Sequence, residues 1–220
     1  MQRSHCRAQL LTLVDSLWRR YTASQLKAAG FSVSELKQGG FIVKQLKAVG
    51  YPASVLKENG FTAIELRQGT FNAKDLKPLG YSVEELRLAL FPSSDLRTVG
   101  FLLHELKFGG YNATDLRSAG FGAGEMKLAE FSAIDLKTAG FSAGEMKIAG
   151  YTAEQMKEAQ FTAKKLRPAG YVASELLIAQ WSVEVLKTAG YTATELKDAG
   201  CNAAELKAVA YSLSDLRAAG

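Results

Sequence analysis

Two histidines, two cysteines and a periodic series of carboxylates are the side chains of this sequence that could catalyse a reaction or bind a metal. His5 and His104 stand far apart, and neither has a partner at the spacing of a metal ligand or a general base. Cys6 and Cys201 follow no metal-binding or disulfide spacing. The carboxylates recur at a fixed interval, which is typical of a structural role. We therefore expect no enzyme, no cofactor and no metal site.

These carboxylates belong to a ten-residue pattern that fills most of the chain. From Tyr21 to Gly220 the order aromatic, Ser/Thr, Ala, any residue, Glu, Leu, Lys, any residue, Ala, Gly recurs twenty times without insertion or deletion. Repeats this short build a body in which each unit contacts mainly its neighbours. The pattern predicts a decapeptide-repeat solenoid over residues 21–220, with few residues left for dedicated chemistry.

Both ends of the repeat carry helix signals. When the aromatic residue is counted as position one, position two is Ser, Thr or Asn in fourteen repeats and position five is usually Glu, Asp or Gln, the pattern of a capping box. Gly at position ten, also in fourteen repeats, suits a left-handed residue that ends the helix, after which the next aromatic packs back in a Schellman motif. Each repeat then forms one helix of about six or seven residues, too short to be stable alone.

A helical wheel places positions three, six, nine and ten on one buried face and positions four and eight outward. The predicted fold is an all-α solenoid, or superhelix, of about twenty short single-helix repeats. A β-solenoid resembling pentapeptide-repeat proteins is the alternative, because bulky residues at positions one and six also recur every five residues. Pro78 and Pro168 occupy position eight, so we expect these two helices to end early or to tighten into 3-10 turns.

A longer period overlies the repeat. Between residues 71 and 150, Asp and Glu alternate at position five, while large apolar residues at position eight alternate with Pro, Thr or Ser. This twenty-residue period indicates either alternating inner and outer helices or duplication of a two-repeat segment. Tyr21, Tyr51, Tyr81 and Tyr111 instead recur every thirty residues. The number of helices per superhelical turn therefore stays open.

Residues 1–20 lie outside the repeat pattern. Leu13, Val14, Leu17 and Trp18 follow helical spacing, and four arginines accompany them. We interpret this segment as an amphipathic helix that caps the first repeat, with organellar targeting or anchoring at a membrane surface as alternatives. No apolar run is long enough to cross a bilayer, so we expect an intracellular, cytoplasmic protein unless residues 1–20 direct it to an organelle.

Charge follows the repeat as well. Position seven is Lys or Arg in every repeat except the one with Leu177, which predicts a basic stripe beside the acidic residues of position five. We expect the two stripes to pair with each other while their aliphatic stems cover the core. Because residues 21–220 hold 23 basic and 21 acidic residues, the charge balance gives little reason to expect nucleic acid or anionic lipid as a partner. The stripe begins with Lys27, Lys37, Lys47, Lys57, Arg67, Lys77, Arg87, Arg97, Lys107 and Arg117.

Apolar residues also occupy positions that the wheel turns outward. Such a row could bind a partner protein or a second solenoid, unless the superhelix curls enough to bury it. The candidates are Ile64 and Ile134 at position four, and Leu88, Phe108, Leu128 and Ile148 at position eight.

The repeat is clearest at 141–150 and 191–200. It resembles the decapeptide arrays of large microbial and protist proteins of unassigned role, and the resemblance covers residues 21–220. That resemblance implies an extended scaffold and no active-site residue. We expect a non-enzymatic scaffold that binds other proteins. Binding of nucleic acid or anionic membrane through the Lys/Arg stripe and self-assembly through the ends of the solenoid are the alternatives.

Overall fold

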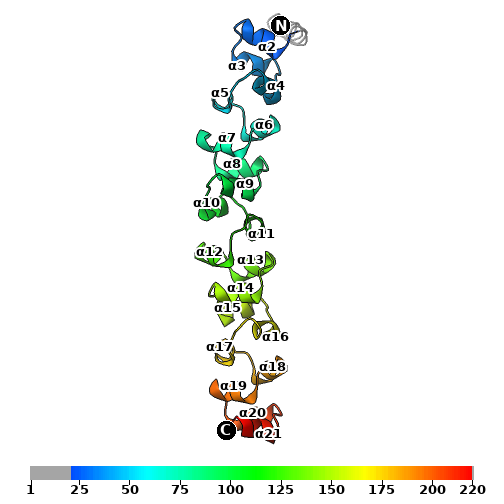
Figure 1. The fold of residues 1–220 in the computed structure, drawn as a ribbon, viewed down its shortest axis with the longest axis vertical. Coiled ribbons are helices and arrows are strands. Elements are labelled where there is room, and N and C mark those ends of the chain that lie inside the picture. Colours follow the sequence, from blue (N-terminus) through cyan, green and yellow to red (C-terminus); the bar gives the residue numbers. More distant parts are fainter. Residues whose placement is uncertain (1–20, 220) are drawn as a thin grey trace, which may run out of the picture. The chain divides into compact units, whose positions relative to one another are not determined.

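The computed structural model describes residues 21–219, which contain short helices at ten-residue intervals and no strand (Figure 1). The prediction of an all-α solenoid is confirmed for these residues, and the β-solenoid alternative is wrong. The chain divides into two compact units, Met1–Gly110 and Tyr111–Gly220. The helix predicted for residues 1–20 lies outside the described residues.

In the first unit the helices are α2 (Ala23–Ala28), α3 (Val33–Gln38), α4 (Val43–Ala48), α5 (Ala53–Glu58), α6 (Ala63–Gln68), α7 (Ala73–Leu76), the 3-10 helix η1 (Lys77–Leu79), α8 (Val83–Leu88), α9 (Ser93–Thr98) and α10 (Leu103–Phe108). In the second unit they are α11 (Ala113–Ser118), α12 (Ala123–Leu128), α13 (Ala133–Thr138), α14 (Ala143–Ile148), α15 (Ala153–Glu158), α16 (Ala163–Leu166), α17 (Ala173–Ile178), α18 (Val183–Thr188), α19 (Ala193–Asp198), α20 (Ala203–Ala208) and α21 (Leu213–Ala218).

Apart from α7 and α16, each helix occupies positions three to eight, and most begin and end as the repeat predicts. In α3 the Ser32 hydroxyl accepts a hydrogen bond from the Glu35 backbone N–H at 3.2 Å, and the Glu35 carboxylate accepts one from the Ser32 N–H at 2.8 Å. At the other end Gly40 has a φ of 81°, and the N–H of Phe41 donates to the carbonyl of Leu36 at 3.0 Å. This pair of motifs is a capping box followed by a Schellman motif. The aromatic residue therefore joins consecutive helices.

Alternate helices pack against each other. In the first unit α4 packs on α6 and α6 on α8, while in the second α11 packs on α13 and α12 on α14. Within each unit the even-numbered helices thus form one column, the even column, and the odd-numbered helices form another, the odd column. Neighbours in a column are two repeats apart, so the twenty-residue period is the stacking period of the fold.

The core consists of positions one, three and six. Leu36 and Leu66 at position six are fully buried, and Phe61 at position one is 4% exposed. Burial of each such leucine stabilises the fold by about 2 to 3 kcal/mol. A single six-residue helix cannot bury its leucine without neighbouring helices. Position ten was predicted to be buried, and this was wrong: it is exposed throughout the described residues. The helix stops at position eight, so the wheel does not extend to the left-handed residue at position ten.

Departures from the repeat are local. At Pro78 the helix α7 ends at Leu76 and continues as η1, and at Pro168 the helix α16 ends at Leu166, as the sequence predicted. Six residues other than Gly have a left-handed φ at position ten, which costs about 1 to 2 kcal/mol each. They are Thr70, Leu90, Glu130, Gln160, Gln180 and Ala210.

Candidate interaction surfaces

The cations of position seven reach across the stack. The Nζ atom of Lys47 donates to the carbonyl of Thr70 at 2.9 Å and lies 4.2 Å from the centre of the Phe71 ring. Thr70 follows the end of α6, where carbonyls without a helical partner carry partial negative charge. The face of an aromatic ring also attracts a cation. One lysine therefore ties its own repeat to the repeats two and three places ahead.

The same arrangement recurs along the predicted basic stripe. Many of its cations donate to a backbone carbonyl 22 or 23 residues ahead, so the stripe is present but these charged groups are already hydrogen-bonded. The residues with this bond include Lys27, Lys37, Lys57, Arg67, Lys77, Arg87 and Arg117. Arg97 and Lys107 are half-buried at the equivalent position.

The carboxylates of position five mainly cap their own helices. Hydrogen bonds from the Ser32 side chain and backbone lower the pKa of Glu35, and those from Ser212 do the same for Asp215. The predicted pairing with position seven occurs where a cation meets the acid 28 residues ahead. These ion pairs include Arg117 with Glu145 at 3.9 Å, Lys147 with Glu175, and Arg167 with Glu195 at 3.3 Å.

Tyrosine hydroxyls add a series of bonds that the sequence analysis missed. The Tyr171 hydroxyl donates to the carbonyl of Tyr151 at 2.7 Å, and the Tyr191 hydroxyl donates to Tyr171 at 2.5 Å. Tyr151 in turn donates to Phe131 at 2.6 Å. Burial raises the pKa of Tyr171 and of Tyr191 to about 12. The signal was the twenty-residue spacing of tyrosines from 151 to 211.

Shallow grooves lie between stacked helices of one column. Positions one to four of a repeat form one wall, and position eight of the repeat two places ahead lies on the other. The groove between α15 and α17, of about 400 Å³, is bordered by Glu154, Glu175 and Ile178. The groove between α17 and α19 has a similar volume of about 400 Å³. That between α16 and α18 measures about 500 Å³.

The apolar residues predicted to face outward are exposed, so the superhelix does not bury them. At position eight Phe108 is 97% exposed, Ile148 90% and Leu128 88%. The others, less exposed, are Leu88, Ile64 and Ile134. In the first unit Ile64, Leu88 and Phe108 lie on α6, α8 and α10 of the even column, which pack on one another in that order. In the second unit Leu128 and Ile148 lie on α12 and α14 of the even column, which pack on each other, whereas Ile134 lies on α13 of the odd column.

The remaining reactive side chains are isolated. His104 is exposed at position four of α10. Cys201 is a buried free thiol whose pKa is raised by burial. Within residues 21–219 no group of three or more His, Cys, Asp or Glu side chains could hold a metal ion. Nor is any helix in that range long and apolar enough to cross a membrane.

Comparison with known families agrees with this geometry. The profile of the decapeptide repeat region matches residues 20–93, 91–163 and 150–220. The chain belongs to the decapeptide repeat family. The matches together span the whole array of the decapeptide repeat protein described above, including the repeats in which Pro78 and Pro168 shorten a helix. Neither a curated protein nor a solved structure matches the chain.

Proposed function

We propose that this decapeptide repeat protein is a non-enzymatic scaffold that binds other proteins through apolar side chains on its outer surface. The exposure of Phe108, 97%, carries the proposal. Most of the chain's polar chemistry is used internally, for caps and for bonds between repeats. Burying large exposed apolar side chains against another protein releases more free energy than burying any other part of this surface.

The distribution of these side chains in the first unit supports a single binding face. Ile42, Ile64, Leu88, Leu102 and Phe108 are all exposed and all belong to the even column. At positions two, four and eight, the helices α3, α5, α7 and α9 of the odd column carry only Ser, Pro, Asn, Lys, Gln, Glu or Thr. At these three positions, therefore, only the even column of this unit carries large aliphatic and aromatic side chains.

The residue type at position 102, a leucine, also supports a binding face on the even column. This residue is the N-cap of α10, where Ser or Thr would satisfy a backbone N–H at a gain of about 1 kcal/mol. Leu90 likewise takes a left-handed conformation that favours Gly, with a φ of 64°. Both leucines are exposed, so neither is compensated by core packing. Departures from local preference of this kind are expected where a surface has a function.

The experiment combines photo-crosslinking with substitution. A photoreactive phenylalanine analogue is placed at Phe108, or at Thr98 on α9 as the control, in cells that produce the protein. We expect adducts with the same protein partner from position 108 only. The double variant Leu88→Ser, Phe108→Ser should keep its helical content, because both side chains are exposed, and should bind that partner at least tenfold more weakly. Equal crosslinking from both positions, or unchanged binding, contradicts the proposal.

Two alternatives have less support. Binding of nucleic acid or anionic membrane through the Lys/Arg stripe must compete with the carbonyl bonds that already hold cations such as Lys47. It predicts affinity for an oligonucleotide or for phosphatidylserine vesicles that falls steeply with salt. Self-assembly through the ends of the solenoid predicts a mass that rises with concentration in sedimentation equilibrium. An intracellular location accompanies the scaffold proposal, because Cys201 is a free thiol.

A further inference from the structure

The groove between α16 and α18 differs in charge from the two odd-column grooves, between α15 and α17 and between α17 and α19. In the groove between α15 and α17, Lys147 pairs with Glu175, and beside the next groove of the odd column Arg167 pairs with Glu195. Both pairs join position seven to the acid 28 residues ahead. The corresponding partner of Lys157 is Val185, which lines the same groove. Lys157 therefore has no carboxylate opposite it.

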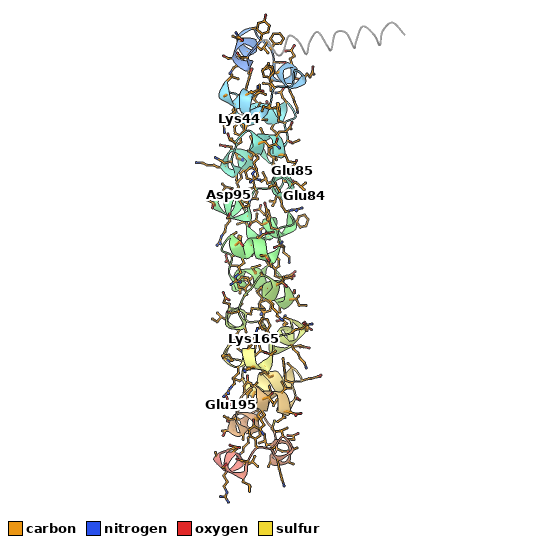
Figure 2. All side chains as sticks on the ribbon, turned by 90° about the vertical axis from the view of Figure 1, so that its right-hand side faces the viewer. Lys44, Glu84, Glu85, Asp95, Lys165 and Glu195 are labelled. Atoms are coloured by element: carbon orange, nitrogen blue, oxygen red, sulfur yellow. The ribbon has the colours of Figure 1, made fainter. Side chains whose placement is uncertain are left out.

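A second lysine adds to this imbalance. Lys164 stands at position four of its repeat, where the groove between α15 and α17 has Glu154. Both Lys157 and Lys164 line the groove between α16 and α18, and no Asp or Glu does. Lys165, labelled in Figure 2, follows on α16 at the position that is acidic in most repeats. The groove is thus a local excess of positive charge.

Lys157 is held in place at the groove. Its Nζ atom donates to the carbonyls of Ala179 and Gln180, at 2.9 and 2.8 Å, and lies 5.7 Å from the centre of the Trp181 ring. An ammonium group has three donors, so one N–H is left for a ligand. The lysine is thereby oriented before any ligand arrives, which lowers the entropic cost of binding.

Trp181, which lines the same groove, carries a donor without a partner within residues 21–219. Its Nε1 atom is buried, and among the described residues it has no hydrogen-bond partner. In the odd column, the tyrosines at this position donate to the carbonyl twenty residues earlier, as Tyr171 does to Tyr151. Thr162, at the N-cap of α16, makes no capping bond, in contrast to Thr152 at the N-cap of α15. The groove between α16 and α18 therefore lacks two hydrogen bonds, one from the residue at position one and one at the N-cap, that are present in the odd column.

We propose that the groove between α16 and α18 binds an acidic segment of another protein, with one of its carboxylates seated between Lys157 and Lys164. Trp181 and Val185 provide the apolar floor against which the segment packs. A carboxylate of the bound segment would supply the negative charge that Glu175 and Glu195 supply to the grooves of the odd column. This inference does not depend on the apolar surface of the first unit.

The surroundings favour a short acidic peptide over a long polyanion. Residues 111–219 carry twelve Lys or Arg against thirteen Asp or Glu, so the positive charge is confined to the groove. Nucleic acid binds through many phosphates along an uncompensated basic track. A peptide with a few carboxylates needs only the two lysines and the apolar floor.

Tryptophan fluorescence reports binding at the groove directly. In the full chain with Trp18→Phe, Trp181 is the single tryptophan. The probes are a seven-residue peptide with three glutamates, blocked at both ends, its glutamine counterpart, and a single-stranded oligonucleotide. We expect a saturable change in Trp181 emission with the glutamate peptide, weakened by salt, and binding of the glutamine peptide at least tenfold weaker. Equal affinity for the two peptides, or tighter binding of the oligonucleotide, overturns the proposal.

Matched variants locate the site. Val185→Glu gives Lys157 the internal partner that Lys147 has in Glu175, and Lys164→Ser places there the serine found at Ser174. Each should raise the dissociation constant of the glutamate peptide at least tenfold while the far-UV circular dichroism spectrum is retained. Lys207→Ser removes the same charge from α20 and should leave binding unchanged. If Val185→Glu binds as tightly as the parent, or if Lys207→Ser weakens binding as much as Lys164→Ser, the proposal is wrong.

Discussion

Replacing Lys47 by methionine tests whether the position-seven cations hold the repeats together. Methionine keeps an apolar stem of similar length but removes the ammonium group, and with it the bonds to the carbonyl and hydroxyl of Thr70 at 2.9 and 3.2 Å. Lys44→Met is the matched control. Lys44, labelled in Figure 2, lies on the same helix α4, is exposed, and loses the same charge.

The expected loss follows from the contacts of Lys47. A hydrogen bond from a charged donor contributes about 1.5 to 3 kcal/mol. An exposed cation–π contact, here 4.2 Å from the Phe71 ring centre, adds about 0.5 to 1 kcal/mol. Because Lys47 is only half-buried and Thr70 is exposed, water replaces part of the bonding, and we take the lower ends, about 2 kcal/mol in all. Lys44→Met should change stability by less than about 0.5 kcal/mol.

Equilibrium unfolding in urea, followed by far-UV circular dichroism, measures the difference. With a slope of about 2 kcal/mol per molar urea, Lys47→Met should lower the midpoint by about 1 M. Hydrogen exchange should show faster exchange at the Phe71 amide, whose N–H donates to the carbonyl of Leu66. Equal midpoints for the two variants would refute the stapling role of the position-seven cations.

Three further predictions concern the backbone, a cap and the tyrosines. Gly124→Ala, in the first turn of α12, should stabilise the protein by about 0.5 kcal/mol, whereas Gly170→Ala, at a φ of 89°, should destabilise it by about 1 kcal/mol. At neither position does the new Cβ meet an atom within 4 Å, so the difference comes from the backbone conformation. Urea midpoints that move in the same direction would contradict this prediction. Lys165→Glu should restore the capping box of α16 and raise the urea midpoint by an amount equivalent to about 1 kcal/mol, and a lowered midpoint would count against it. Burial raises the pKa of Tyr171 and Tyr191 from 10.0 to about 12, so the folded state favours the neutral phenol. The stability that results is complete below pH 10 and should be lost as pH rises toward 12. Phenolate absorbance and circular dichroism, recorded together, measure this loss. Phenolate formation complete at pH 10 in the folded protein would exclude that burial.

The helix boundaries could be predicted because their causes are local. Ser32 and Glu35 cap one helix and Gly40 ends it, and all three lie within one repeat. The effect of Pro78 could be predicted for the same reason. Position ten was misplaced, since the wheel assumed a helix that continues past position eight, and position nine is fully buried in only some repeats.

The partners of the charged residues could not be predicted because they depend on stacking. Lys47 bonds to a backbone carbonyl rather than to an acid, and that carbonyl comes close only because alternate helices pack together. The sequence shows periods of both twenty and thirty residues. Stacking with a thirty-residue period would place Lys47 beside a different repeat from the one that contains Thr70. For the apolar candidates, the outward positions could be predicted from the wheel, but the shared column of Ile64, Leu88 and Phe108 required the stacking period.

Stacking by alternate helices has a consequence for how such an array changes in length. Every bond between repeats spans a fixed number of residues, so adding or removing whole decapeptides leaves each bond with an equivalent partner. A single added repeat, however, moves every later helix from one column to the other and carries its surface residues to the opposite side. An added pair preserves both columns. The parity of an insertion, more than its length, therefore decides whether a binding face survives it, and selection on such a face would favour growth in steps of twenty residues.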